Sequence, residues 1–373
     1  MTVLWRYHLA HEFPQEIESL RTEFPDTQQV VAEDREQFRS ALPHADIVVS
    51  APMTEAEHRS AVSMKAHFMP YAGVNRLPLN EYAERGIIVA NSHGNADVVA
   101  ERAVTLALAA AGRVVEFHNG LREGLWARRH GDPAQIFEYW QSLQGKRCVS
   151  VGVGRIGCRI AELMRGFNCE FTGVGRRASR PEGGDLSATT GDNRSDQNSK
   201  DNQDNTRSRQ GTQNAPFERI ETNLITALHG ADVVFLALPL TPETEGIIGS
   251  EALQAMDGAL LVNVSRGEII QEEPLYRSLS SRTAGHPDAR PETEKGPYAA
   301  GLDCWWVYPD SFEEPRLPSR FPFHRLDNVV LSPHAASHTS EGKWGQLAET
   351  LENIRSFLKT GTPKHKVDLT AGY

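Results

Sequence analysis

Three glycines with the spacing G-x-G-x-x-G lie in the segment VSVGVGRIG, residues 149–157. Gly152 would permit a tight turn, Gly154 would let the backbone approach a pyrophosphate, and Gly157 would allow a helix to pack closely on a strand. The spacing alone is common. Here an apolar run precedes it and the helical pattern RIAELMRGF follows it, so free N–H groups at the helix start would face an anion. This context predicts a dinucleotide-binding site.

The end of the next apolar run bears on which dinucleotide is bound. Sites for NAD place an acid about 20 residues after the glycines, where it binds the adenosine ribose. In this chain Gly175 is followed by Arg176 and Arg177. An acid would repel a 2′-phosphate, whereas guanidinium groups attract it. The pattern therefore favours NADP(H), with NAD(H) as the other cofactor considered. The alternative is that both arginines are solvated side chains at the start of a surface loop.

The elements that must position these residues alternate along the chain. Before residue 52, the runs TVLWRY, QVVAE and ADIVVSAP alternate with helical stretches, which is typical of an α/β fold. From Asp97 to Gly124 an apolar periodicity predicts one long helix with an Asp cap and a glycine stop. Near-continuous apolar runs, expected of strands buried on both faces, then follow: RCVSVGV, CEFTGVG, DVVFLALP, ALLVNVS, YAAGLDCW and NVVLSPH.

Length and composition exclude several classes of protein. The 373 residues suit two domains, and 39% apolar residues suffice for their cores. The net charge of −10 argues against a general nucleic-acid binder and against anchoring on anionic membranes. The four cysteines show no paired spacing, so neither a metal site nor a disulfide framework is predicted. The N-terminal segment becomes acidic too early for a secretory signal, which favours a cytoplasmic protein.

Residues 183–215 depart from this composition, because they contain one large aliphatic side chain, Leu186, and no aromatic one. Such a segment cannot bury enough apolar surface to offset the entropy lost on ordering. The sequence predicts a disordered surface insertion here, with a regulatory segment as the alternative. A second, shorter insertion is predicted at residues 280–296.

Several motifs occur in an order that resembles the D-isomer-specific 2-hydroxyacid dehydrogenases. The resemblance runs from about Tyr71 to Thr339 and rests on YAGVNRLPLNEYAERGIIVAN, NADVVAERAVTLAL, the glycine motif, ADVVFLALPLTPETEGII, LVNVSRGEII, AAGLDCW and NVVLSPH. It implies two Rossmann-like domains, each a doubly wound parallel sheet, with a cleft between them. A flavodoxin-like substrate domain would comprise residues 1–96 and 335–373, and the dinucleotide-binding domain residues 97–334. It also implies a homodimer formed through the helix at 97–124.

The implied reaction is hydride transfer between a nicotinamide cofactor and a small 2-oxo or D-2-hydroxy acid, such as glyoxylate or hydroxypyruvate. Arg266 could bind the carboxylate and polarise the carbonyl, and His334 could donate the proton. A structural ion pair and an ordinary surface histidine are the alternatives. The resemblance assigns the substrate cradle to Ala72, Gly73, Val74 and Asn91. It assigns further cofactor contacts to Arg155, Ile156, Leu238, Pro239, Thr244, Val264, Ser265 and Asp303.

In this family a glutamate a few residues beyond the Asp303 position normally pairs with the histidine and tunes its pKa. Counting without gaps, Tyr308 occupies that place, within GLDCWWVYPD. Counting back from His334, Glu314 is the alternative. Tyr308 is favoured because DCWWVYP is similar to the aromatic-rich segment of formate dehydrogenases, where the acid is also absent. Formate-like oxidation without acid–base help, or a nucleotide-sensing binding protein without turnover, are therefore alternative functions. The presence of both Arg266 and His334 weighs against the binding protein.

Overall fold

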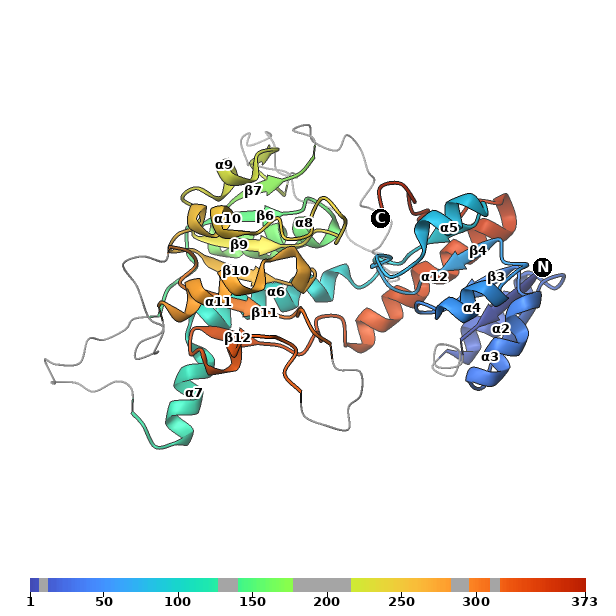
Figure 1. Cartoon of the computed structure of the whole chain (residues 1–373), viewed down its shortest axis with the longest axis horizontal. Helices are drawn as coiled ribbons and strands as arrows, with labels where there is room; N and C mark the ends of the chain where they lie inside the picture. The colour runs from blue at the N-terminus through green and yellow to red at the C-terminus, as the bar shows by residue number, and fades with distance from the viewer. Residues whose placement is uncertain (7–12, 127–139, 177–215, 283–294, 309–315) are drawn as a thin grey trace, which may run out of the picture.

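Two separate parallel sheets, of five and seven strands, divide the chain into two halves (Figure 1). The computed structural model describes residues 1–6, 13–126, 140–176, 216–282, 295–308 and 316–373. The predicted insertion at 183–215, most of that at 280–296, and the candidate residues Arg177 and Glu314 lie outside the described residues.

The N-terminal half has the strand order β2-β1-β3-β4-β5, and all neighbouring strands are parallel. Helix α12 (Ser340–Thr360) returns from the end of the chain to cover this sheet, where Leu351, Ile354 and Phe357 join Phe68 in one core cluster. No helix in the described part of the chain is long and apolar enough to cross a membrane. The remaining elements of this half are β1 (Thr2–Trp5), α2 (Pro14–Glu23), β2 (Gln28–Val31), α3 (Arg35–Ala41), η1 (Leu42–His44), β3 (Ile47–Val49), α4 (Glu55–Ser60), β4 (Ala66–Phe68), α5 (Leu79–Glu84) and β5 (Ile88–Ala90).

The C-terminal half has the order β12-β11-β10-β9-β6-β7-β8. All six predicted strands are present: β6 (Arg147–Val151), β7 (Glu170–Val174), β9 (Val233–Leu236), β10 (Leu260–Asn263), β11 (Ala299–Leu302) and β12 (Val329–Leu331). The additional strand β8 (Arg219–Glu221) extends one edge. The strand order reverses between β6 and β9, and ligands of open α/β sheets bind in the crevice at such a point. The other elements are α8 (Arg155–Met164), η2 (Arg165–Phe167), α9 (Leu224–Leu228), α10 (Ser250–Ala255), η4 (Gly267–Ile269), α11 (Glu272–Ser280) and η5 (Phe323–Arg325).

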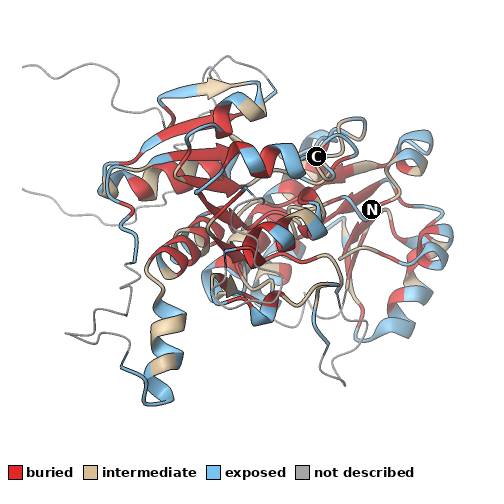
Figure 2. Ribbon diagram, turned by 60° about the vertical axis from the view of Figure 1, so that its left-hand side comes forward, coloured by how far each residue is buried: buried red, intermediate tan, exposed pale blue. Residues whose placement is uncertain are grey.

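The single helix predicted from Asp97 to Gly124 is wrong in one respect, because the structure divides it into α6 (Ala96–Ala111) and α7 (Val114–Arg122). Arg113 adopts a left-handed conformation with φ 51°, and its Nε donates to Glu116 Oε2 at 2.7 Å. Apolar spacing continues across this break, so periodicity alone could not reveal it. Helix α6 packs on the seven-stranded sheet, whereas α7 projects from it and buries no residue (Figure 2).

The chain crosses between the halves twice, before α6 and before α12. At this crossing Gly94 lies directly against α12, since a Cβ on Gly94 would be 2.0 Å from the carbonyl oxygen of Gly345. Glycine at both positions therefore allows the two connecting segments to touch.

Candidate active site

The glycine turn lies at the carboxyl end of β6 and shows a different environment for each glycine. A Cβ on Gly152, whose φ is 111°, would be 2.3 Å from the oxygen of Ala237, and one on Gly157 would be 2.2 Å from the oxygen of Gly152. A Cβ on Gly154 would meet nothing within 4 Å. Helix α8 starts next to Gly154 without a side-chain cap, which leaves its first N–H groups for another acceptor. These residues fit a dinucleotide pyrophosphate.

The loop after β9 borders the same crevice. Thr244 Oγ1 donates to the oxygen of Pro239 at 2.7 Å and accepts from the N–H of Thr241 at 2.8 Å, which closes a turn after Leu238. Ile156, in the first turn of α8, packs against the core cluster that includes α6. Thr244 and Ile156 therefore stabilise the loop and the core of this half. That they also contact a cofactor remains a prediction.

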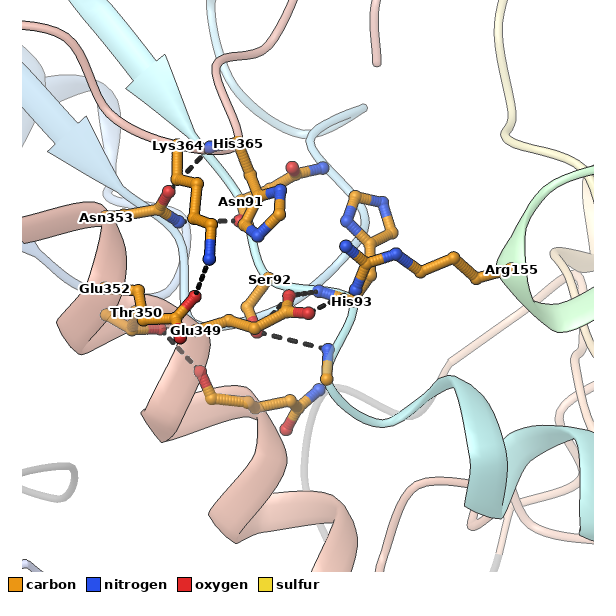
Figure 3. A network of polar contacts seen from close by, with 12 residues as sticks. Asn91, Ser92, His93, Arg155, Glu349, Thr350, Glu352, Asn353, Lys364 and His365 are labelled. Carbon is orange, nitrogen blue, oxygen red and sulfur yellow. Dashed lines mark hydrogen bonds and ion pairs between the residues drawn. The ribbon is translucent and has the colours of Figure 1, made fainter. Parts of the chain in front are cut away.

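Arg155, the first residue of α8, joins the two halves through a polar network (Figure 3). Its guanidinium forms an ion pair with Glu349 of α12, whose other carboxylate oxygen accepts from the N–H of His93 at 2.6 Å. Burial opposes ionisation of Glu349, but the His93 N–H and the Arg155 guanidinium outweigh it, so the pKa of Glu349 is lowered. In this structure the predicted cofactor residue Arg155 is bound by Glu349, which belongs to the N-terminal half.

Ala72, Gly73 and Val74, the residues predicted to cradle the substrate, lie in the loop between β4 and α5. Asn91 is buried, and its Nδ2 donates to the backbone oxygen of Ala72 at 2.7 Å. The backbone oxygen of Asn91 in turn accepts from Asn353 Nδ2 at 3.0 Å (Figure 3). Within the described residues, the N–H groups of Ala72, Gly73 and Val74 have no hydrogen-bond acceptor. Asn91 therefore positions a loop with N–H groups available for an anion.

Arg266 reaches this loop from the opposite half, where it follows β10. Asn263 holds the turn, because its Oδ1 accepts from the N–H and Oγ of Ser265 at 3.0 and 2.7 Å and its Nδ2 donates to the oxygen of Arg266 at 2.9 Å. Val264 is buried within this turn. A Cβ on Gly73 would be 2.1 Å from Arg266 Nη2, so the guanidinium lies against the Gly73 backbone. The geometry places a cation beside the unpaired N–H groups.

His334 follows β12 and has a left-handed backbone, with φ 54°. This conformation is unfavourable for a non-glycine residue and persists where the surroundings hold it. The buried carboxylate of Asp303 supplies that hold, since it accepts from Ser332 Oγ and from the N–H groups of Ala335 and Ala336 at 3.0 and 3.1 Å. Sequence reasoning assigned Asp303 to the cofactor and missed these bonds to the histidine loop.

The surroundings of His334 disfavour its charged form. Burial and the positive charge of Arg266 lower the pKa of His334, and the negative charge of Asp303 opposes them only in part. The ring of Tyr308 lies beside the imidazole, with centroids 5.4 Å apart, and its hydroxyl accepts from the N–H of Trp305 at 3.3 Å. Burial raises the pKa of Tyr308 to about 12, so this neighbour is a neutral phenol.

Trp305 and Trp306, the two tryptophans of the aromatic segment, hydrogen-bond to the backbone near His334 and Arg266. Trp305 Nε1 donates to the oxygen of Ser332, and Trp306 Nε1 donates to the oxygen of Ile270, both at 2.8 Å. Trp306 also stacks on Phe323, with ring centroids 5.3 Å apart. The pair therefore ties the loops that carry His334 and Arg266 to the core.

Arg176 lies exposed at the carboxyl end of β7, next to the crevice. Its guanidinium carbon is 4.8 Å from the centroid of the Tyr373 ring. The carboxylate of Glu243 also lies within electrostatic range: a hydrogen bond from Thr241 lowers its pKa most, and Arg176 contributes.

One half is a doubly wound sheet with a glycine turn at its switch point, and the other half has N–H groups beside Arg266 that are free within the described residues. This arrangement is typical of a dinucleotide-dependent enzyme. A family model described as "D-isomer specific 2-hydroxyacid dehydrogenase, NAD binding domain" matches residues 104–195 and 203–289. A glyoxylate reductase of Korarchaeum cryptofilum is 27% identical over 361 residues, covering 95% of this chain and 90% of that protein. The chain is therefore similar to the D-isomer-specific 2-hydroxyacid dehydrogenases over most of its length, and it is an NAD(P)-dependent oxidoreductase.

Solved structures agree on the fold. An NADPH-dependent glyoxylate/hydroxypyruvate reductase of Sinorhizobium meliloti, in complex with NADP and malonate, superposes with a TM-score of 0.68 at 20% identity, covering 99% of this chain and 97% of that one. A 2-hydroxyacid dehydrogenase of Lactobacillus delbrueckii in its NAD-complexed form gives a TM-score of 0.68 at 19% identity, with 99% and 100% coverage. At this identity the likeness establishes the fold alone.

Proposed function

We propose that this enzyme reduces small 2-oxo acids, such as glyoxylate or hydroxypyruvate, to D-2-hydroxy acids and prefers NADPH. The observation that carries the proposal is the contact of Arg266 with Gly73, because it unites a guanidinium and unpaired backbone N–H groups from opposite halves. A carboxylate is the group that such a set of donors binds. His334 lies close enough for the charge of Arg266 to lower its pKa.

Each residue then has a defined task in the reaction. The cradle of Ala72, Gly73 and Val74, held by Asn91, would bind the carboxylate. Arg266 would bind carboxylate and carbonyl together and stabilise negative charge on the carbonyl oxygen. A ring nitrogen of His334 would give its proton to that oxygen. When bound, the nicotinamide supplies the hydride to the carbonyl carbon.

The remaining parts of the proposal concern the cofactor and the domains. The glycine turn and the α8 N-terminus would hold the pyrophosphate, and Arg176 with Arg177 the 2′-phosphate. We also propose the domain boundaries near residues 96/97 and 334/335, which the packing of α6 and α12 on different sheets supports. Contacts of Arg155, Asp303, Leu238, Pro239, Val264 and Ser265 with the cofactor belong to the same proposal.

One observation favours a second candidate, which is oxidation of formate. The neutral Tyr308 beside His334 resembles a site that works without an acid–base pair. Formate oxidation needs no proton transfer at the reacting carbon, whereas reduction of a 2-oxo acid does. The two candidates therefore differ in whether His334 must carry a proton.

Two assays on purified protein decide between the candidates. One measures oxidation of NADPH and NADH with glyoxylate, hydroxypyruvate, pyruvate and phosphohydroxypyruvate, and the other measures reduction of NAD(P)⁺ with formate. We expect NADPH oxidation with at least one 2-oxo acid. Reduction of NAD(P)⁺ with formate alone would support the second candidate. Binding of a dinucleotide without turnover of any substrate would leave only a nucleotide-binding role.

The preference for NADPH over NADH should be lost when Arg176 and Arg177 are both changed to serine. Two charge-assisted contacts, at roughly 1.5–3 kcal/mol each, imply at least about a tenfold rise in KM for NADPH, with KM for NADH unchanged. The exposed Arg325, near the opposite edge of the sheet, provides the matched control as Arg325→Ser. A preference of the unmodified protein for NADH would show that the arginine argument is wrong.

We further propose a homodimer, now placed on the segment that includes α7. This helix buries no residue, and Val114, Leu121, Leu125 and Trp126 are each more than half exposed. Monomeric proteins seldom expose so many large apolar side chains in one place. Sedimentation equilibrium should therefore give twice the mass of the chain, and Leu121→Lys with Trp126→Lys should give monomers. A monomeric unmodified protein would contradict the proposal.

A further inference from the structure

The segment after α12 packs against the N-terminal half and forms a closed turn at residues 368–373. The N–H of Val367 donates to the oxygen of Val89 in β5 at 2.8 Å, and Leu369 packs against the core of that half. Asp368 Oδ1 accepts from the N–H groups of Thr370 and Ala371 at 2.9 and 3.1 Å. The N–H of Asp368 also donates to the oxygen of Tyr373 at 3.1 Å. The backbone at Tyr373 is therefore held in place.

Gly372 and Tyr373 of this turn contact the C-terminal half on both sides of the glycine loop. The ring of Tyr373 lies under the Arg176 guanidinium at 4.8 Å, at the end of β7. A Cβ on Gly372 would be 3.8 Å from Thr241 Cγ2, in the loop after β9. Because β7 and β9 are the two neighbours of β6, residues 372 and 373 span the end of the crevice where the adenosine half of a dinucleotide binds. The C-terminal end of the chain lies between the halves in Figure 1.

The contact with Tyr373 engages Arg176 in a way that leaves its hydrogen-bond donors available. A cation–π contact uses the face of the guanidinium, whereas phosphate oxygens bind its N–H edge. An exposed arginine otherwise loses much side-chain freedom when it binds an anion. A ring against one face restricts that freedom beforehand, so less is lost on binding.

We propose that Tyr373 is a positioning residue for cofactor selection: it holds Arg176 so that the guanidinium edge binds the 2′-phosphate of NADPH. The inference rests on the proposed NADPH preference and adds a residue contributed by the other half of the molecule. The aromatic ring carries the effect, and the phenol hydroxyl has no part in it.

The test measures equilibrium binding by titration calorimetry on the full chain, with no turnover involved. Tyr373→Ala should raise the Kd for NADPH and for the fragment 2′,5′-ADP roughly two- to fivefold, the factor that a surface cation–π contact is worth. The Kd for NADH and for 5′-ADP should not change. Tyr373→Phe should bind all four ligands like the unmodified protein. In an Arg176→Ser background, Tyr373→Ala should have no further effect, because the group that it positions is gone.

Other outcomes overturn the inference in distinguishable ways. Equal weakening of all four ligands would mean that Tyr373 contacts the shared nucleotide or only supports the fold. Tighter binding of NADPH by Tyr373→Ala would mean that the ring obstructs the phosphate site. Failure of the unmodified protein to prefer 2′,5′-ADP over 5′-ADP would refute the NADPH preference itself, whereas intact preference in Tyr373→Ala refutes the role of Tyr373 alone.

Discussion

His334→Ala should lower turnover of the best 2-oxo acid by roughly two to four orders of magnitude, the contribution expected of a positioned proton donor. The Kd for NADPH should stay unchanged, since His334 is proposed to transfer a proton to the substrate and not to bind the cofactor. The matched control is His338→Ala, which removes a second imidazole from the same loop and should leave kcat within a few-fold. Retention of full turnover by His334→Ala would show that His334 is not the proton donor.

The pH profile follows from the sign of the pKa shift. Reduction requires the imidazolium form, and burial and Arg266 lower the pKa of His334 below its usual value of about 6.5. The protonated fraction therefore falls at lower pH than for an ordinary histidine, and turnover should already decline as pH rises toward neutrality.

Tyr308→Glu would add a carboxylate beside the imidazole, stabilise its charged form and move the declining limb to higher pH. Tyr308→Phe and Glu314→Gln should leave the limb in place. A shift with Glu314→Gln, with Tyr308→Phe silent, would instead identify Glu314 as the paired acid.

Features that depend on neighbouring residues could be predicted from the sequence. The different environments of Gly152, Gly154 and Gly157 follow from one turn between a strand and a helix. Gly152 has a positive φ, and neither Gly152 nor Gly157 has space for a Cβ. The buried strands were equally predictable, because a strand covered on both faces needs a continuous apolar run. Strand β8 was missed, since its pattern RIE is short and only partly buried.

Features that depend on distant residues could not be predicted. Arg155 and Glu349 are 194 positions apart, and nothing near either one indicates the ion pair. Asp303 was assigned to a cofactor by its place in a motif, but its hydrogen bonds go to a loop 29 to 33 positions away. Likewise no local pattern links Tyr373 with Arg176. Such contacts arise from how the halves meet, and they concentrate at the site.

Arg266→Ala should lower kcat/KM by about two to three orders of magnitude, as expected when a donor that stabilises developing negative charge is removed. Arg266→Lys keeps the charge but loses the planar fork, so it should recover only part of this activity. Gly73→Ala provides an independent test, because the new Cβ would lie 2.1 Å from Nη2 and displace the guanidinium. Its KM for the 2-oxo acid should rise while the Kd for NADPH stays constant.

A second readout separates this role from a structural one. Because the charge of Arg266 lowers the pKa of His334, its removal should raise that pKa. The residual activity of Arg266→Ala should therefore decline at higher pH than that of the unmodified enzyme, whereas Arg266→Lys should keep the original limb. A loss of activity with an unmoved pH profile and a lower Tm would show that Arg266 only supports the fold. The predicted pattern requires that one arginine both binds the substrate and sets the charge of the proton donor.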